Sequence, residues 1–223
     1  MESGTQAEHI AAAILRASTP VLKISKVGGR AWKRNVPQKD GRYGPWLPAS
    51  WDVVDQKTWQ RRVPSLYLVV GDDQVIRYVG ISRNRVADRW RLSPAFDAET
   101  GQSLAHNQLF HSQCWPHLQR EAKRYEVRCI SGDELVPVLE RLGPPVSGFT
   151  ALKGDPEGIA AAVERWLCNH QSDRLVSWNV AMTRRRKTLQ PADPPPTRPF
   201  QRTAPPCWRR FSREAALGRE RPC

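Results

Sequence analysis

Five residues carry side chains that together could hydrolyse a phosphodiester bond, namely Tyr67, Tyr78, Arg89, Glu164 and Asn179. This reaction needs a base that takes a proton from water, positive charge beside the phosphorane-like transition state, and a metal ion or an acid at the leaving oxygen. A phenol, a guanidinium and a carboxylate can fill these roles. Because a phenol has an ordinary pKa of about 10, a tyrosine base needs help from a nearby cation. The chemistry therefore depends on elements that bring the five side chains together.

The two tyrosines lie in a predicted β-hairpin. The runs Ser65–Val70 and Gln74–Gly80 are rich in β-branched and aromatic residues, and they flank the turn sequence Gly71-Asp72-Asp73. With a loop of two or four residues Tyr67 opposes Tyr78, which places both phenols on one face of the sheet, whereas a bulge breaks this register. A cross-strand aromatic pair of this kind also occurs where it only stabilises a sheet.

A helix is predicted directly after the hairpin, over Asn84–Leu92. Val86 and Trp90 form its buried side, while Arg85 and Arg89 are neighbours one turn apart. The short connection from the hairpin places Arg89 close to the tyrosines.

These motifs and their order resemble the GIY-YIG nuclease family. Ser65-Leu66-Tyr67 stands where that family has Gly-Ile-Tyr, and Tyr78-Val79-Gly80 stands where it has Tyr-Ile-Gly. Arg89 is similar to the family's helix arginine that contacts the scissile phosphate. Glu164 is similar to its single metal-binding glutamate, and Asn179 to the late asparagine that completes its site. The resemblance covers about half of the chain.

The resemblance implies a DNA endonuclease that uses Mg²⁺ or Mn²⁺. Glu164 would hold the metal, Gly80 and Arg85 would contact the substrate, and the other four matched residues would be catalytic. In this sequence Ser93 stands where many members have a histidine. We therefore name His106 as the auxiliary catalytic residue, which would point at the phosphate or at the attacking water; a histidine that only packs is the alternative.

A zinc site is the other interpretation of the histidines. His106, His111 and His117 accompany Cys114 in the region 105–118, which we expect to be a helix disturbed near Pro116. The four residues lack the paired spacing of known zinc ligands, so this pattern is weak.

The expected fold is α/β (more narrowly α+β), with a small three-stranded antiparallel sheet flanked by helices. Tyr125–Ser131 is the predicted third strand, and Asp133–Leu142 is a predicted helix. Glu8–Arg16 is a further helix candidate that ends at Ser18.

The chain is expected to comprise three parts. Residues 1–63 would form an N-terminal helix and a basic, aromatic extension, residues 64–182 the nuclease domain, and residues 183–223 a disordered tail rich in proline and arginine. The extension would either grip a nucleic-acid backbone or be anchored to the domain by its tryptophans. Arg184, Arg185 and Arg186 in the tail are candidate substrate-binding residues.

The composition of the chain indicates which kinds of partner it can bind. The 223 residues carry a net charge of +13, which attracts polyanions and makes DNA the leading candidate. No run approaches the ~18 apolar residues of a membrane helix, so we expect no membrane association. No signal-peptide pattern is visible at the start, so we expect an intracellular protein, either cytoplasmic or nucleoid-associated. The sequence does not determine an oligomeric state. Two alternatives stay open: a catalytically inactive nucleic-acid-binding module, and a protein whose basic tail docks on an acidic partner.

Overall fold

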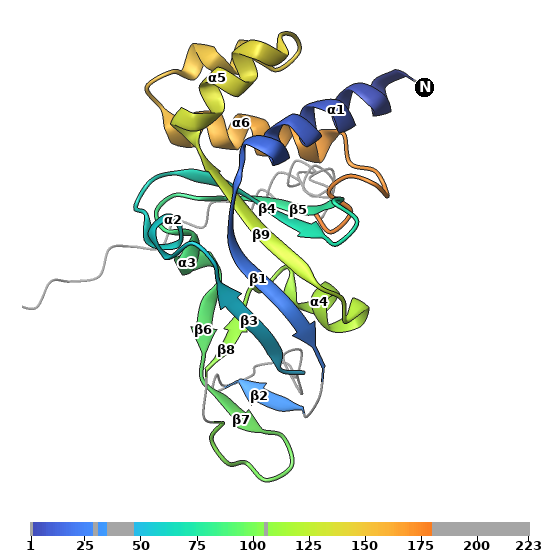
Figure 1. Cartoon of the computed structure of the whole chain (residues 1–223), viewed down its shortest axis with the longest axis vertical. Helices are drawn as coiled ribbons and strands as arrows, with labels where there is room; N and C mark the ends of the chain where they lie inside the picture. Colours follow the sequence, from blue (N-terminus) through green and yellow to red (C-terminus); the bar gives the residue numbers. More distant parts are fainter. Residues whose placement is uncertain (1, 29–30, 35–46, 105–106, 180–223) are drawn as a thin grey trace, which may run out of the picture. The chain divides into compact units, whose positions relative to one another are not determined.

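The computed structural model describes residues 2–28, 31–34, 47–104 and 107–179. Its main feature is a five-stranded antiparallel sheet with the strand order β3-β1-β9-β4-β5 (Figure 1). The strands are β1 (Thr19–Val27), β3 (Ala49–Val53), β4 (Ser65–Gly71), β5 (Ile76–Ser82) and β9 (Tyr125–Ser131). Two small two-stranded sheets pair β2 (Trp32–Arg34) with β7 (Ala95–Asp97) and β6 (Arg91–Ser93) with β8 (Gln108–Phe110).

Helices flank the sheet. They are α1 (Glu2–Ala17), α2 (Gln56–Gln60), α3 (Val86–Arg89), α4 (Trp115–Glu121), α5 (Gly132–Leu142), the 3₁₀ turn Ser147–Leu152 and α6 (Pro156–Asn169). The mixed α/β class with an antiparallel sheet is confirmed. No helix in the described ranges is long and apolar enough to cross a membrane.

The expected number of three strands is wrong, because β1 and β3 join the sheet from a region that we expected to be an extension. In β1, Val21, Leu22 and Ile24 are buried, while Lys23 and Lys26 are exposed. The lysines interrupt the apolar residues in the sequence and hide the strand. Pairing with β9 on one side and β3 on the other places β1 inside the sheet, where its apolar side chains are covered.

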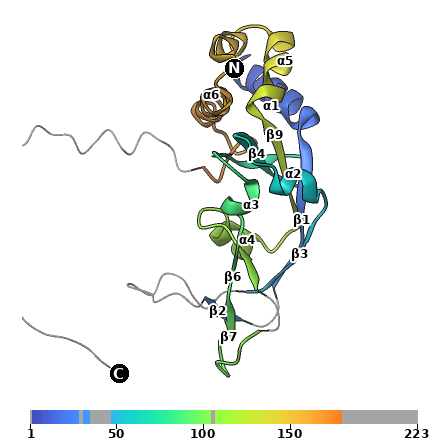
Figure 2. The same cartoon turned by 90° about the vertical axis from the view of Figure 1, so that its left-hand side faces the viewer.

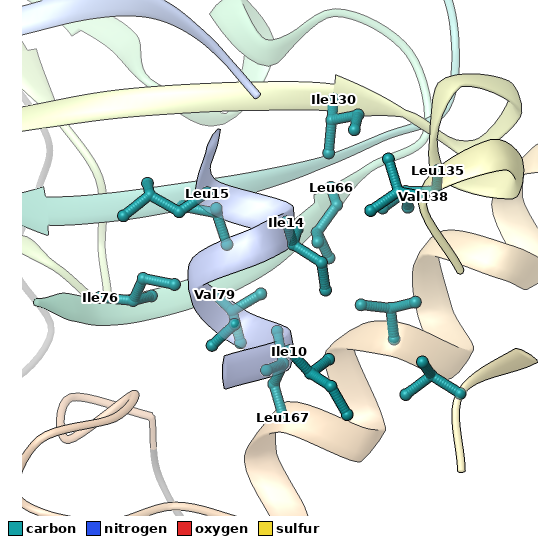
Figure 3. Packing of buried hydrophobic residues seen from close by; sticks show 14 of the residues in the cluster. Ile10, Ile14, Leu15, Leu66, Ile76, Val79, Ile130, Leu135, Val138 and Leu167 are labelled. Atoms are coloured by element: carbon teal, nitrogen blue, oxygen red, sulfur yellow. The ribbon is translucent and has the colours of Figure 1, made fainter. Parts of the chain in front are cut away.

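Alternation along the strands separates two cores. One face packs against α1, α5 and α6 and contains Ile14, Leu66 and Val79, shown with their neighbours in Figure 3. The opposite face holds Tyr67 and Tyr78 together with a cluster of tryptophans. Figures 1 and 2 show α1, α5 and α6 grouped at one end of the sheet and α3 and α4 away from them. The tyrosines therefore belong to the core that lies across the sheet from α1.

The predicted pairing of Tyr67 with Tyr78 is wrong, although their shared face is not. Tyr67 pairs with Gly80, and Tyr78 pairs with Val69. Two one-residue changes cause this shift: the hairpin loop has three residues and ends at Gln74 with a φ of 60°, and a bulge follows between Val69 and Val70. Because the changes add up to two residues, and side chains alternate with a period of two, both phenols still project from the same face.

The predicted helix Asn84–Leu92 is shorter in the structure. Only Val86–Arg89 is helical, and Arg91–Ser93 forms strand β6, which pairs with β8. No side chain caps the helix at Arg85, and the proline after Ser93 favours an extended conformation there. Val86 and Trp90 are buried as predicted.

Of the other predicted elements, some are confirmed and some are wrong. The strand Tyr125–Ser131 has its predicted bounds, and the helix predicted over Asp133–Leu142 is α5. The N-terminal helix is longer than expected and ends just before Ser18. The helix expected over 105–118 is wrong, because a strand and a turn precede α4, which begins only at Trp115.

Two tryptophans of the expected extension anchor it to the domain. Trp32 and Trp59 are buried, and the Trp32 ring lies 5.9 Å from that of Trp115 in an edge-to-face arrangement. This supports the anchoring interpretation for these two residues. The expected tail, 183–223, lies outside the described residues.

Candidate active site

The phenols of Tyr67 and Tyr78 lie side by side on one face of the hairpin formed by β4 and β5. Their ring centroids are 6.1 Å apart with 31° between the planes, and both residues are buried. Gly80, directly opposite Tyr67, makes room for this ring: a Cβ atom there would lie 2.4 Å from Tyr67 Oη and 2.6 Å from Cζ. Gly80 was predicted to contact substrate, but its visible effect is to let the Tyr67 ring pass over the backbone of β5.

His111 is a further member of the site that the sequence analysis did not identify. Its Nε2 lies 2.9 Å from Tyr67 Oη, while its Nδ1 accepts hydrogen bonds from the backbone N–H groups of Cys114 and Gln113. A neutral imidazole whose Nδ1 accepts carries its proton on Nε2. His111 therefore donates to Tyr67 Oη, and the Tyr67 proton is free to point elsewhere.

Burial lowers the pKa of His111 to about 4, and the positive charge of Arg89 adds to the effect. The ring is also packed 4.7 Å from the ring of Trp90. His111 is therefore neutral at physiological pH and acts as a hydrogen-bond donor, not as a cation.

We expect His111 to make the protein sensitive to acid. An unfolded histidine titrates near 6.5, so its contribution to stability is present above this pH and is lost as the pH falls through about 4. A shift of one pKa unit corresponds to about 1.4 kcal/mol of stability. Acidification from neutral pH should therefore lower the free energy of unfolding by about 3 kcal/mol. Urea unfolding at several pH values will measure this, and His111→Gln should flatten the slope. An equal slope in wild type and variant would contradict the assignment.

Arg89 lies at the exposed end of α3, and its charge acts on the whole group. Burial raises the pKa of Tyr67 well above its ordinary value, and Arg89 partly opposes this. Burial raises the pKa of Tyr78 as well, with Tyr67 adding to the effect. The Tyr78 hydroxyl also donates to Gln113 Oε1. Both phenols are therefore protonated at neutral pH, and Arg89 favours the phenolate of Tyr67.

Glu164, on α6, acts on Tyr78 and Arg89 through its charge. Burial raises the pKa of its carboxyl, and Arg89 and Arg165 oppose this. Its charge in turn raises the pKa of Tyr78. Among the described residues, none forms a hydrogen bond or ion pair with this half-buried carboxylate. A partly desolvated carboxylate without a partner suits a cation.

The donor set defines what kind of metal site is feasible. Within the described ranges, no three or more His, Cys, Asp and Glu residues gather into a group that could hold a metal ion. Glu164 would therefore be one ligand, with water and phosphate oxygens as the others, which is a common arrangement for Mg²⁺. His117, which the zinc interpretation named as a possible ligand, stacks on the ring of Trp178, and the two ring centroids are 5.0 Å apart.

Asn179 supports the strand that carries Tyr78. Its Oδ1 accepts from the backbone N–H of Val79 at 3.0 Å, and its Nδ2 donates to the carbonyl of Val79 at 2.8 Å. The backbone N–H groups of Val176 and Trp178 also donate to β5. Asn179 thus positions β5 between its two site residues and acts through the backbone.

The remaining predicted site residues are less central. The Arg85 guanidinium is engaged with Asp88 at 2.6 Å and with Gln60 at 3.3 Å. His106, Arg184, Arg185 and Arg186 lie outside the described residues. The structure places Tyr67, Tyr78 and His111 against one another, and the charges of Arg89 and Glu164 act on this group.

Comparison with protein-family models, with curated proteins and with solved structures gave no match to this chain.

Proposed function

We propose that this chain is a metal-dependent endonuclease that hydrolyses DNA phosphodiester bonds with a site of the GIY-YIG type. One observation carries the proposal: the Tyr67 hydroxyl oxygen accepts a hydrogen bond from neutral His111 and lies in the field of Arg89. Both features stabilise a phenolate relative to a phenol. A merely structural aromatic pair needs neither of them.

The proposed mechanism assigns the base to Tyr67. Tyr67 would first release its proton to water, the Nε2–H of His111 and the charge of Arg89 would stabilise the phenolate, and the phenolate would then take a proton from the attacking water. The hydroxyl of Tyr78 instead donates to Gln113, which favours its protonated form. Since Tyr67 is fully buried, the proposal requires that DNA binding opens a path for water to its hydroxyl.

Arg89 and Glu164 would act on the phosphate. The exposed guanidinium of Arg89 is free of carboxylate partners among the described residues and can neutralise a non-bridging oxygen. Glu164 would hold one Mg²⁺ or Mn²⁺, which supplies positive charge at the leaving oxygen. Asn179 would keep β5 in place through its two hydrogen bonds to Val79.

Incubation of the purified protein with supercoiled plasmid tests the proposal. We expect nicked or linear products with Mg²⁺ or Mn²⁺ and none with excess EDTA. Without the metal, no positive charge would stabilise the leaving oxygen. Arg89→Ala, purified in parallel, should be inactive and so exclude a contaminating nuclease. Cleavage that persists in EDTA, or that is equal in Arg89→Ala, would overturn the proposal.

A second candidate is a catalytically inactive DNA-binding module with the same fold. The burial of Tyr67 and Tyr78, which are 0% and 4% exposed, favours it, because a general base must reach water. This candidate predicts salt-dependent DNA binding without cleavage under every metal condition.

A further inference from the structure

A groove of about 590 Å³ is lined by residues of α2, α3, β3 and β6. We call it the tryptophan groove, after Trp51, Trp59 and Trp90 in its lining. Its other prominent lining residues are Arg85, Arg91 and Leu92. None of the site residues Tyr67, Tyr78 or Glu164 lines it, so it is separate from the candidate active site.

The lining of the tryptophan groove combines polar and charged side chains with an apolar part that is open to solvent. Leu92 is 50% exposed, the largest value among the exposed large hydrophobic residues of the described ranges. Trp51 is partly buried at the edge of the core, and Trp90 is fully buried. The indole N–H of Trp90 has no hydrogen-bond acceptor among the described residues. The exposed Leu92 beside the accessible part of Trp51 is a surface that a flat apolar ligand would cover favourably.

The charges of the groove complement a phosphate. Arg85 is neutralised by Asp88, whereas exposed Arg91 makes no ion pair with a carboxylate of a described residue. The flat apolar lining and this available cation match the two parts of a nucleotide, a base that stacks on aromatic side chains and a phosphate that pairs with arginine.

The chain also links the groove to Arg89. Arg89 is the last residue of α3, and the next two residues, Trp90 and Arg91, line the groove. Two residues span at most about 7 Å, so the backbone of Arg89 lies close to that of Arg91 in the lining of the groove. A strand whose phosphate meets Arg89 can therefore place a neighbouring nucleotide in the groove.

From these features we propose that the tryptophan groove holds one unpaired nucleotide next to the phosphate at Arg89. Bases inside a duplex are stacked on each other and cannot lie against Trp51 or Leu92 unless they leave the stack. The preferred substrate would therefore be DNA with an unpaired nucleotide beside the cleavage position. This inference rests on the proposed function for the position of the phosphate, but the binding that it describes does not require cleavage.

Binding of two fluorescent duplexes in EDTA tests the inference without catalysis. One contains 2-aminopurine as a single unpaired nucleotide, and the other contains it fully paired. We expect wild type to bind the first about tenfold more tightly and to quench its fluorescence, since one base stacked on an aromatic side chain contributes that much. Leu92→Ser should abolish the preference, and so should Trp51→Leu, which keeps an apolar side chain.

Val54→Ser is the matched control. Val54 is 45% exposed, close to the value for Leu92, but does not line the groove. We expect this variant to keep the preference. Equal affinity of wild type for the two duplexes, or an equal loss in Val54→Ser and Leu92→Ser, would overturn the inference. Because cleavage plays no part, an inactive but selective protein would contradict the proposed function and leave this inference standing.

Discussion

Glu164→Gln is expected to abolish metal-dependent cleavage while leaving the fold equally or more stable. The amide keeps the size of the side chain but loses the negative charge that would hold the cation. Loss of a metal that supplies several kcal/mol to the transition state corresponds to about 10³-fold in rate. Single-turnover cleavage across a range of Mg²⁺ concentrations measures this effect, and fluorescence anisotropy in EDTA measures DNA binding.

The stability of Glu164→Gln separates a functional from a structural carboxylate. Burial raises the pKa of Glu164, so the fold disfavours its charged form at neutral pH. A neutral glutamine removes this cost, and we expect a melting temperature equal to or above that of wild type. A structural ion pair would show the opposite sign. DNA binding should persist or tighten, because one negative charge near the phosphate is gone.

Glu157→Gln on the same helix is the control for this experiment. Glu157 is partly exposed and pairs with the exposed Arg83 at 2.6 Å, a surface ion pair of small energetic value. Its cleavage rate should stay within about twofold of wild type, as is usual for surface substitutions. Full Mg²⁺-dependent cleavage by Glu164→Gln would remove Glu164 from the metal site.

Elements of the fold that depend on residues close together in the sequence could be predicted, and those that depend on distant residues could not. The strand Tyr125–Ser131 and the helix α5 were predictable, because their patterns lie within a few residues and end in strong signals. Ser131, for example, caps α5 through a capping box with Glu134. Strand β1 was not predictable in this way, since its burial depends on pairing with β9, about a hundred residues further along the chain.

In the candidate site, too, residues placed by local patterns were predictable, and a residue placed by a long-range contact was not. Tyr67, Tyr78 and Arg89 follow one another along one hairpin and its exit, so local pattern was enough to place them near one another. His111 was missed because the region was predicted to be a helix. In the structure it stands in the turn before α4, where its Nδ1 accepts from two backbone N–H groups. No feature of the sequence states that Nε2 then meets a tyrosine from a distant strand.

Gly80→Ala is expected to damage both stability and cleavage, because the added methyl group and the Tyr67 ring require the same space. The Cβ would lie 2.4 Å from Tyr67 Oη and 3.0 Å from a ring carbon of Tyr78. Overpacking of this kind costs about 1–3 kcal/mol. The Tyr67 ring must also move from His111, and misplacement of a reacting group by about 1 Å can lower the rate ~10²-fold.

Gly148→Ala provides the control for Gly80→Ala, because nothing lies within 4 Å of the Cβ position at Gly148. We expect this control to retain wild-type cleavage. The double variant Gly80→Ala with Tyr67→Phe removes the nearer of the two Tyr67 clashes, so the stability losses of the single variants should add to more than the loss in the double variant. The double variant should still be inactive, because the phenol oxygen that His111 contacts is gone. Strict additivity of the stability losses would show that Gly80 does not act through the Tyr67 ring.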